Sequence, residues 1–97
     1  MAVLMIVRMR GPTQRLLAAA EMIEGRIGMP AGLLARVVAP SEDGIVLVTL
    51  WAGEEARRAS NDAPEHRAAV RASGIESLAE ETVVERHETT SFGFGGR

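Results

Sequence analysis

The sequence contains no cysteine, no lysine and no long hydrophobic run. Without cysteine the chain can form no disulfide, thiolate nucleophile, iron–sulfur cluster or cysteine-based zinc site, and a reducing cytoplasm is the expected location. All 11 basic residues are arginines scattered along the chain. We interpret them as the bias of a GC-rich genome rather than a phosphate-binding surface, so no nucleic-acid partner is expected. Arg8 and Arg10 close the apolar start, which is too short for a secretory or membrane segment.

The composition is that of one small soluble domain. The 97 residues are 46% hydrophobic and 25% charged with a net charge of −2, which is too apolar for a disordered chain. We place the domain at residues 1–90 and a flexible tail at residues 91–97, where glycine recurs without any apolar period. A domain of this size leaves much of its surface exposed, so a dimer would add burial.

Apolar spacing predicts the element order β-α-β-β-α-β. The predicted strands cover residues 2–10, 33–39, 44–51 and 82–89, and the predicted helices cover residues 12–27 and 54–73. We expect the second helix to be interrupted at Ser60–Asn61 and to restart with Asp62 as its N-cap and Pro64 in its first turn. Asp43–Gly44 is expected to supply the positive-φ residues of a tight hairpin turn.

The strand Gly44–Trp51 organises the rest of the chain, because both of its faces are apolar. Such a strand belongs in the middle of a sheet with a covering layer on each side. We therefore predict an α+β fold, an antiparallel sheet in the order 4-1-3-2 with both helices on one face. The second covering layer is expected to be another copy of the chain, which predicts a homodimer through the bare face of the sheet.

Three short motifs carry a resemblance to a known superfamily. They are Gly-Leu-Leu at 32–34, Val-Thr-Leu-Trp at 48–51 followed by Glu54-Glu55-Ala56, and Val-Val-Glu-Arg-His at 83–87. With the element order, they resemble the ferredoxin-like dimeric α/β-barrel superfamily, and within it small proteins of the antibiotic-biosynthesis-monooxygenase type. The resemblance implies a face-to-face dimer with a ligand cavity between sheet and helices in each protomer.

The same resemblance implies several activities. Some members of the superfamily oxidise polycyclic aromatic phenols with dioxygen and without metal or flavin, some degrade haem, and many have no known activity. Trp51 matches a tryptophan that often follows the third strand, and His66 falls where many members carry a histidine. Several active members have an asparagine in the first strand, and residues 2–10 contain none, which counts against either chemistry.

Three aromatic residues are candidates for a site. Trp51, the sole tryptophan, is either a core anchor or part of a ligand wall, and the two roles are compatible. His66 is either a general base toward a phenol or an axial ligand, or else a solvated residue in the first turn of a helix. His87 could line one mouth with Trp51, roughly 10 Å away across two strand spacings, or be an edge-strand residue paired with Glu85 or Glu88, or a dimer contact.

Arg8, Arg36 and Arg86 interrupt apolar strands. Each either pairs with a carboxylate or binds an anionic ligand group, and we name Arg36 and Arg86 as candidate ligand-binding residues. The two histidines lack metal-site spacing, so we predict no metal and no cofactor.

Two functional hypotheses remain open from the sequence. The first is cofactor-independent oxygenation of an apolar aromatic small molecule, with His66 or His87 as the catalytic base. The second is a non-catalytic ligand-binding or assembly module of the same fold. Haem binding ranks below both because of the first strand.

Overall fold

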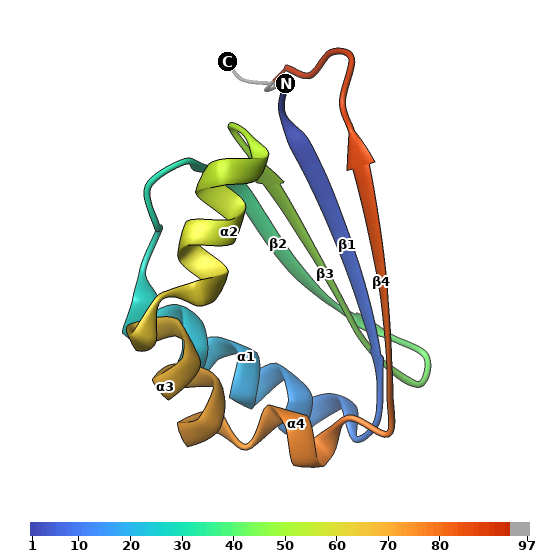
Figure 1. The fold of residues 1–97 in the computed structure, drawn as a ribbon. Coiled ribbons are helices and arrows are strands. Elements are labelled where there is room, and N and C mark those ends of the chain that lie inside the picture. The colour runs from blue at the N-terminus through green and yellow to red at the C-terminus, as the bar shows by residue number, and fades with distance from the viewer. Residues whose placement is uncertain (94–97) are drawn as a thin grey trace, which may run out of the picture.

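A four-stranded antiparallel sheet forms the frame of the molecule, and helices cover one of its faces (Figure 1). The computed structural model describes residues 1–93. The strands lie in the order β2-β3-β1-β4, with the bounds β1 Val3–Arg10, β2 Leu33–Ser41, β3 Gly44–Trp51 and β4 Glu81–Glu88. This is the predicted order 4-1-3-2 read in reverse, so the predicted architecture is confirmed.

Four helices lie on the sheet or at its end: α1 Thr13–Ile27, α2 Glu54–Asp62, α3 Pro64–Ser73 and the single turn α4 Ile75–Leu78. The break in the second predicted helix falls at Ala63 and not at Ser60–Asn61, because a residue before proline is forced into extended backbone. The prediction that Asp62 caps the new helix is wrong. Asp62 ends α2 instead, and its carboxylate lies 3.6 Å from Arg67. Across residues 1–93, none of the helices has the length and apolar character needed to span a bilayer.

The pairing register separates the two faces of the sheet. Val3 of β1 lies opposite Trp51 of β3, and Leu4 lies opposite Leu50 of β3 and His87 of β4. Because successive side chains of a strand point to opposite faces, this register shows on which face of the sheet each strand residue lies. The helix-covered face carries Val3, Met5, Val7, Met9, Ile45, Leu47, Thr49 and Trp51 of the two central strands.

The core lies between this face and the helices. Its buried residues are Leu16, Ala19 and Ala20 of α1, Ile45 of β3 and Ile75 of α4. Leu16 and Ile45 have no exposed surface at all. Burying side chains of this size contributes about 1.5–3 kcal/mol each. Helix α1 is therefore held on the sheet mainly by Leu16 and by the close packing of Ala19 and Ala20.

The other face of the sheet, which we call the open face, has no helix over it. Its central apolar residues are Leu4, Ile6, Val46, Val48 and Leu50, all of them only half-buried. At its edges Val37 of β2 and Val83 of β4 are 56% and 47% exposed. The predicted two-faced apolarity of the central strand is therefore present, with only one face covered within a single chain.

Gly44 shows why the expected hairpin chemistry was wrong. Among residues 1–93, only Gly11, Gly28, Gly32 and Gly74 have positive φ, so Asp43 and Gly44 do not. A Cβ placed on Gly44 would lie 1.8 Å from the carbonyl oxygen of Met9. Glycine is required here by the close approach of β1 and not by the turn.

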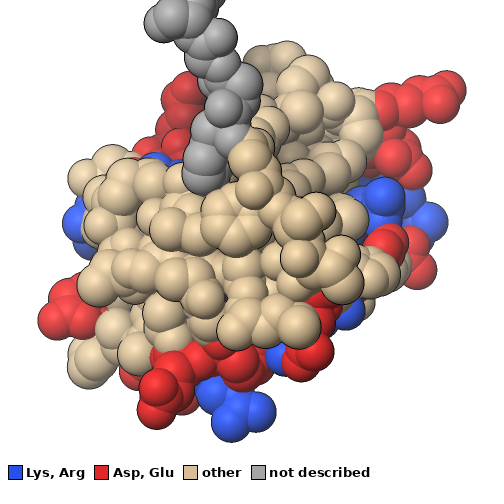
Figure 2. All heavy atoms as spheres, turned by 90° about the horizontal axis from the view of Figure 1, so that it is seen from above, with Lys and Arg blue, Asp and Glu red and all other residues tan. Residues whose placement is uncertain are grey.

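The end of the molecule that carries the N-terminus is largely uncharged. Figure 2 shows uncharged side chains across its middle and charged side chains at its rim. Met1 and Phe92 are 77% and 51% exposed. Residues 91–93 follow β4 without regular structure. The rest of the predicted tail, residues 94–97, lies outside the described residues, and the domain limit at residue 90 stays a prediction.

Candidate functional site

A cavity of about 130 Å³ lies between the helix-covered face of the sheet and the helices. Its apolar walls come from Ile23 and Ile27 of α1, Leu33 of β2, and Leu47 and Trp51 of β3. The amphipathic spacing of α1 turns both isoleucines toward the sheet. An apolar space with few polar groups is the usual form of a small-molecule site.

Trp51 forms one wall of this cavity and is also packed, with 8% of its surface exposed. Its indole Nε1 donates a hydrogen bond to Thr49 Oγ1 at 3.0 Å, and Thr49 lines the same cavity. This bond satisfies the buried N–H and fixes the plane of the ring. Trp51 is therefore a packed anchor that also lines the cavity, and its role as a ligand wall stays a prediction.

Arg36 also lines the cavity, but its guanidinium already has partners. Its NH1 group donates to the carbonyl oxygen of Gly28 at 2.8 Å, and its Nε lies 3.3 Å from Glu24 of α1. These contacts join β2 to the end of α1. Arg36 thus makes contacts that join two elements of the fold, and its role toward a ligand stays a prediction.

His66, in the first turn of α3, also lines the cavity. The extended backbone of Ala63 and the fixed φ of Pro64 start a new helix there, which brings His66 beside Ser60 of α2 at the wall. Its Nδ1 atom is buried and has no hydrogen-bond partner in the described residues. A buried polar atom without a partner is costly, so such an atom in a native structure needs an explanation.

Arg86 lies on the helix-covered face but is not among the residues that line the cavity. Its Nε lies 3.1 Å from Glu54, the first residue of α2, which also binds Arg57 at 2.6 Å and Arg58 at 3.3 Å. The hydrogen bond from Arg57, and then that from Arg86, holds the pKa of Glu54 at about 2, against the opposing effect of desolvation. This ion-pair network ties β4 to α2.

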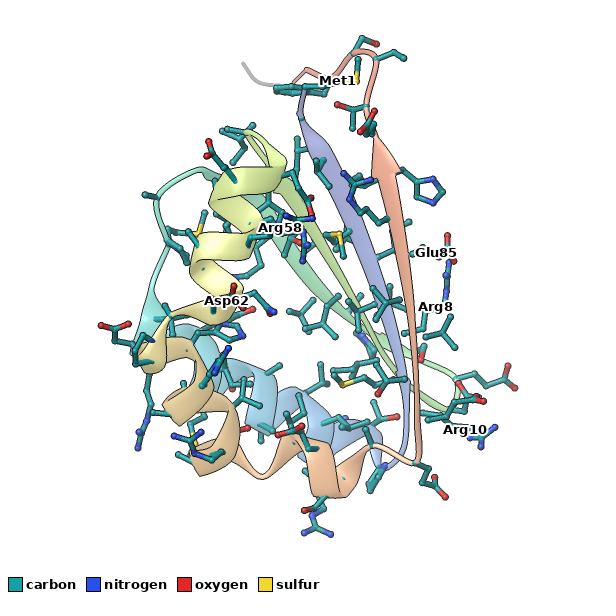
Figure 3. The ribbon with its side chains drawn as sticks, in the orientation of Figure 1. Met1, Arg8, Arg10, Arg58, Asp62 and Glu85 are labelled. Carbon is teal, nitrogen blue, oxygen red and sulfur yellow. The ribbon has the colours of Figure 1, made fainter. Side chains whose placement is uncertain are left out.

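His87 occupies the open face, on the other side of the sheet from Trp51. The expectation that Trp51 and His87 line the same cavity opening is therefore wrong within a single chain. Trp51 lies opposite Val3 of β1 and His87 lies opposite the next residue, Leu4, so the two rings point to opposite faces. His87 Nε2 lies 3.2 Å from Glu85, as the alternative interpretation expected, and Glu85 also pairs with Arg8. Figure 3 shows Arg8 and Glu85 together on the side away from the helices. The His87 hydrogen bond and then the Arg8 contact lower the pKa of Glu85.

Several cavity residues were missed by sequence reasoning. Ile23 and Ile27 fell within the predicted helix 12–27 without being singled out, and Ser60 was named only as part of a helix interruption. Helical spacing says which face is buried but not how deep the space beneath it is. Within residues 1–93, no three His, Asp or Glu side chains gather in a way that could hold a metal ion.

Comparison with known proteins places the chain in a family. No family model and no curated protein sequence matches it. A solved structure from Chloroflexus aurantiacus, provisionally named an antibiotic biosynthesis monooxygenase, is 30% identical over 99% of this chain and 98% of its own, with a TM-score of 0.72. This chain belongs to the antibiotic biosynthesis monooxygenase family. The membership confirms the resemblance found in the sequence.

Two further structures share the fold of this monooxygenase family member at low identity. SnoaB from Streptomyces nogalater, a cofactor-independent oxygenase, is 11% identical over 94% of this chain and 95% of its own, with a TM-score of 0.76. A dimeric protein of unknown function with a ferredoxin-like fold from Bacteroides fragilis is 17% identical over 91% and 96%, with a TM-score of 0.68. At these identities the likeness concerns the fold alone.

Proposed function

We propose that this family member binds an aromatic phenol in the cavity between sheet and helices and oxygenates it with dioxygen, without metal or flavin. The observation that carries the proposal is that His66, whose Nδ1 is buried and has no hydrogen-bond partner in the described residues, is one of the residues that line a mostly apolar cavity. A phenol hydroxyl would give that atom its missing partner while the ring fills the apolar space. Family membership and the cofactor-independent activity of SnoaB support the reaction type.

The proposed reaction begins with proton transfer from the phenol hydroxyl to a neutral His66 ring. The phenolate then gives one electron to dioxygen, and the two radicals join through a new C–O bond at a ring carbon. The peroxide anion so formed takes the proton held by His66 and becomes a hydroperoxide. His66 then removes the hydrogen of that ring carbon as a proton while the O–O bond breaks, so that a carbonyl forms and the outer oxygen leaves as hydroxide. The hydroxide takes this proton back from His66 and becomes water. One phenol and one dioxygen thus become one quinone and one water.

The open face supports the second part of the proposal, a homodimer through the sheet. Half-buried Val46, Val48 and Leu50 on a central strand leave an apolar surface that a second copy would cover. The Bacteroides fragilis protein of this fold is described as dimeric. Arg8, Glu85 and His87 would then lie at or near the interface. The cytoplasmic location predicted from the lack of cysteine is part of the same proposal.

The test of the reaction compares the two histidines of the chain. His66→Gln keeps a polar side chain of similar length but removes the base, so we expect oxygen consumption with a hydroquinone substrate to fall about 10²–10⁴-fold. His87→Gln is the matched control, since that ring lies on the other face of the sheet. Saturable quenching of the single Trp51 measures binding in each variant. Full turnover in His66→Gln would show that His66 is not the base.

A non-catalytic binding protein is the second candidate. It is favoured by the absence, within residues 1–93, of a carboxylate hydrogen-bonded to His66, because catalytic bases are usually oriented by a third group. Saturable binding without oxygen uptake would support this candidate. Haem is disfavoured by volume, since a porphyrin is far larger than a cavity of about 130 Å³.

A further inference from the structure

The volume of the cavity restricts the ligand to fewer rings than a polycyclic phenol contains. The cavity measures about 130 Å³, and an engineered apolar cavity of about 150 Å³ in another protein is known to hold one benzene ring. We infer that the ligand is a single-ring phenol and that Ile27 sets this limit. The inference rests on the proposed phenol-binding function and narrows it to one substrate class.

Most of the wall cannot move outward without disrupting the fold. Trp51 is packed and hydrogen-bonded to Thr49, and Leu47 lies on a central strand against the core. On the side of β2, the Arg36 contacts to Glu24 and to the Gly28 carbonyl hold the end of α1 in place. Because protein interiors are close-packed, adding a fused ring against these walls would force side chains off their preferred positions.

Ile27 is the exception, because it borders two spaces. It lines the inner cavity and also an outer depression of about 250 Å³ between the end of α1 and the start of α3. Pro30, Ser60 and His66 border both spaces as well. Removing the Ile27 side chain would join the two spaces without touching Trp51 or the buried core residues of α1.

The same geometry orients the ligand. His66 and Ser60 lie at the end shared with the outer depression, whereas Trp51 and Leu47 belong to the inner cavity alone. The hydroxyl of the phenol therefore lies toward the α2–α3 junction and the ring lies against Trp51. A second fused ring would have to extend past Ile27.

The experiment compares phenol with 2-naphthol by isothermal titration calorimetry on the intact protein. In an open groove the larger ligand binds more tightly, because it buries more apolar surface. In a cavity limited to one ring we expect the reverse order, with 2-naphthol weaker by about tenfold or more, a difference of about 1.4 kcal/mol. In Ile27→Ala the two dissociation constants should become about equal.

Val37→Ala serves as the matched control, since it truncates an exposed side chain on the open face and should preserve the wild-type order. Equal or tighter binding of 2-naphthol to the wild type would overturn the size limit while leaving the phenol-binding proposal intact. If 2-naphthol still binds more weakly than phenol to Ile27→Ala, Ile27 does not set the size limit. Absence of saturable heat with either compound would refute phenol binding itself, and the inference with it.

Discussion

A negative charge in the middle of the open face should separate the proposed dimer. Val48 lies between Ile6 of β1 and Val37 of β2 on that face, and it is only half-buried within one chain. In a dimer formed through this face its remaining surface would be covered by the partner. Val48→Asp removes apolar surface from the interface and places a carboxylate there.

The expected loss of dimer stability follows from the burial of residue 48 and from the two-fold symmetry of the interface. About half of a valine side chain remains to be covered, which is worth about 1 kcal/mol per chain. An unpaired carboxylate taken out of water costs several kcal/mol, so about 3 kcal/mol per chain is a lower bound. A two-fold interface contains the substitution twice. The dimer should therefore weaken by about 6 kcal/mol, roughly a 10⁴-fold rise in the dissociation constant.

Sedimentation equilibrium at micromolar concentration measures the mass of each variant in solution. The wild type should sediment with the mass of two chains and Val48→Asp with the mass of one. Val84→Asp is the matched control, because it makes the same exchange on the helix side of the edge strand β4, where Val84 is 57% exposed. A wild type that sediments as a single chain, or a Val48→Asp variant that stays dimeric, would refute the reasoning.

Two further predictions concern the frame of the fold. Gly44→Ala should unfold the protein or lower its melting temperature steeply, since its Cβ would meet the Met9 backbone. Gly25→Ala, in an open part of α1, should instead stabilise it by about 0.5–1 kcal/mol in denaturant titrations. Equal effects of the two glycine substitutions on the free energy of unfolding would contradict this account. The pKa of Glu54 is lowered from 4.5 to about 2, so its contribution to stability is present above pH 4.5 and is lost as the pH falls toward 2. Melting temperatures of the wild type and Glu54→Gln should converge over that range, and a constant difference would argue against the network.

The architecture could be predicted from the sequence because its signals are local. Apolarity on both faces of residues 44–51 placed that strand in the centre of the sheet, and helical spacing placed α1 on one side. Pro64 marked the start of α3 correctly, although the break itself lies at Ala63. Each of these signals is carried by residues close together in the chain.

The site was harder to predict because it depends on register and packing depth. His87 pairs with Leu4 and Trp51 with Val3, and this difference of one residue puts the two rings on opposite faces. No local pattern fixes such a register. Likewise, the role of Gly44 depends on how closely β1 approaches it, and the Ile27 boundary depends on where α3 begins relative to the end of α1.

The attachment of α2 affects how a ligand leaves the cavity. This helix contributes Ser60 to the cavity wall but has no buried residue, and its first turn is held by the ion pairs of Glu54. Elements with few buried contacts open at lower free energy than the rest of a fold, and ion pairs near the surface weaken as salt screens them. Ligand release should therefore accelerate with ionic strength, even though the surface that holds the ligand is apolar.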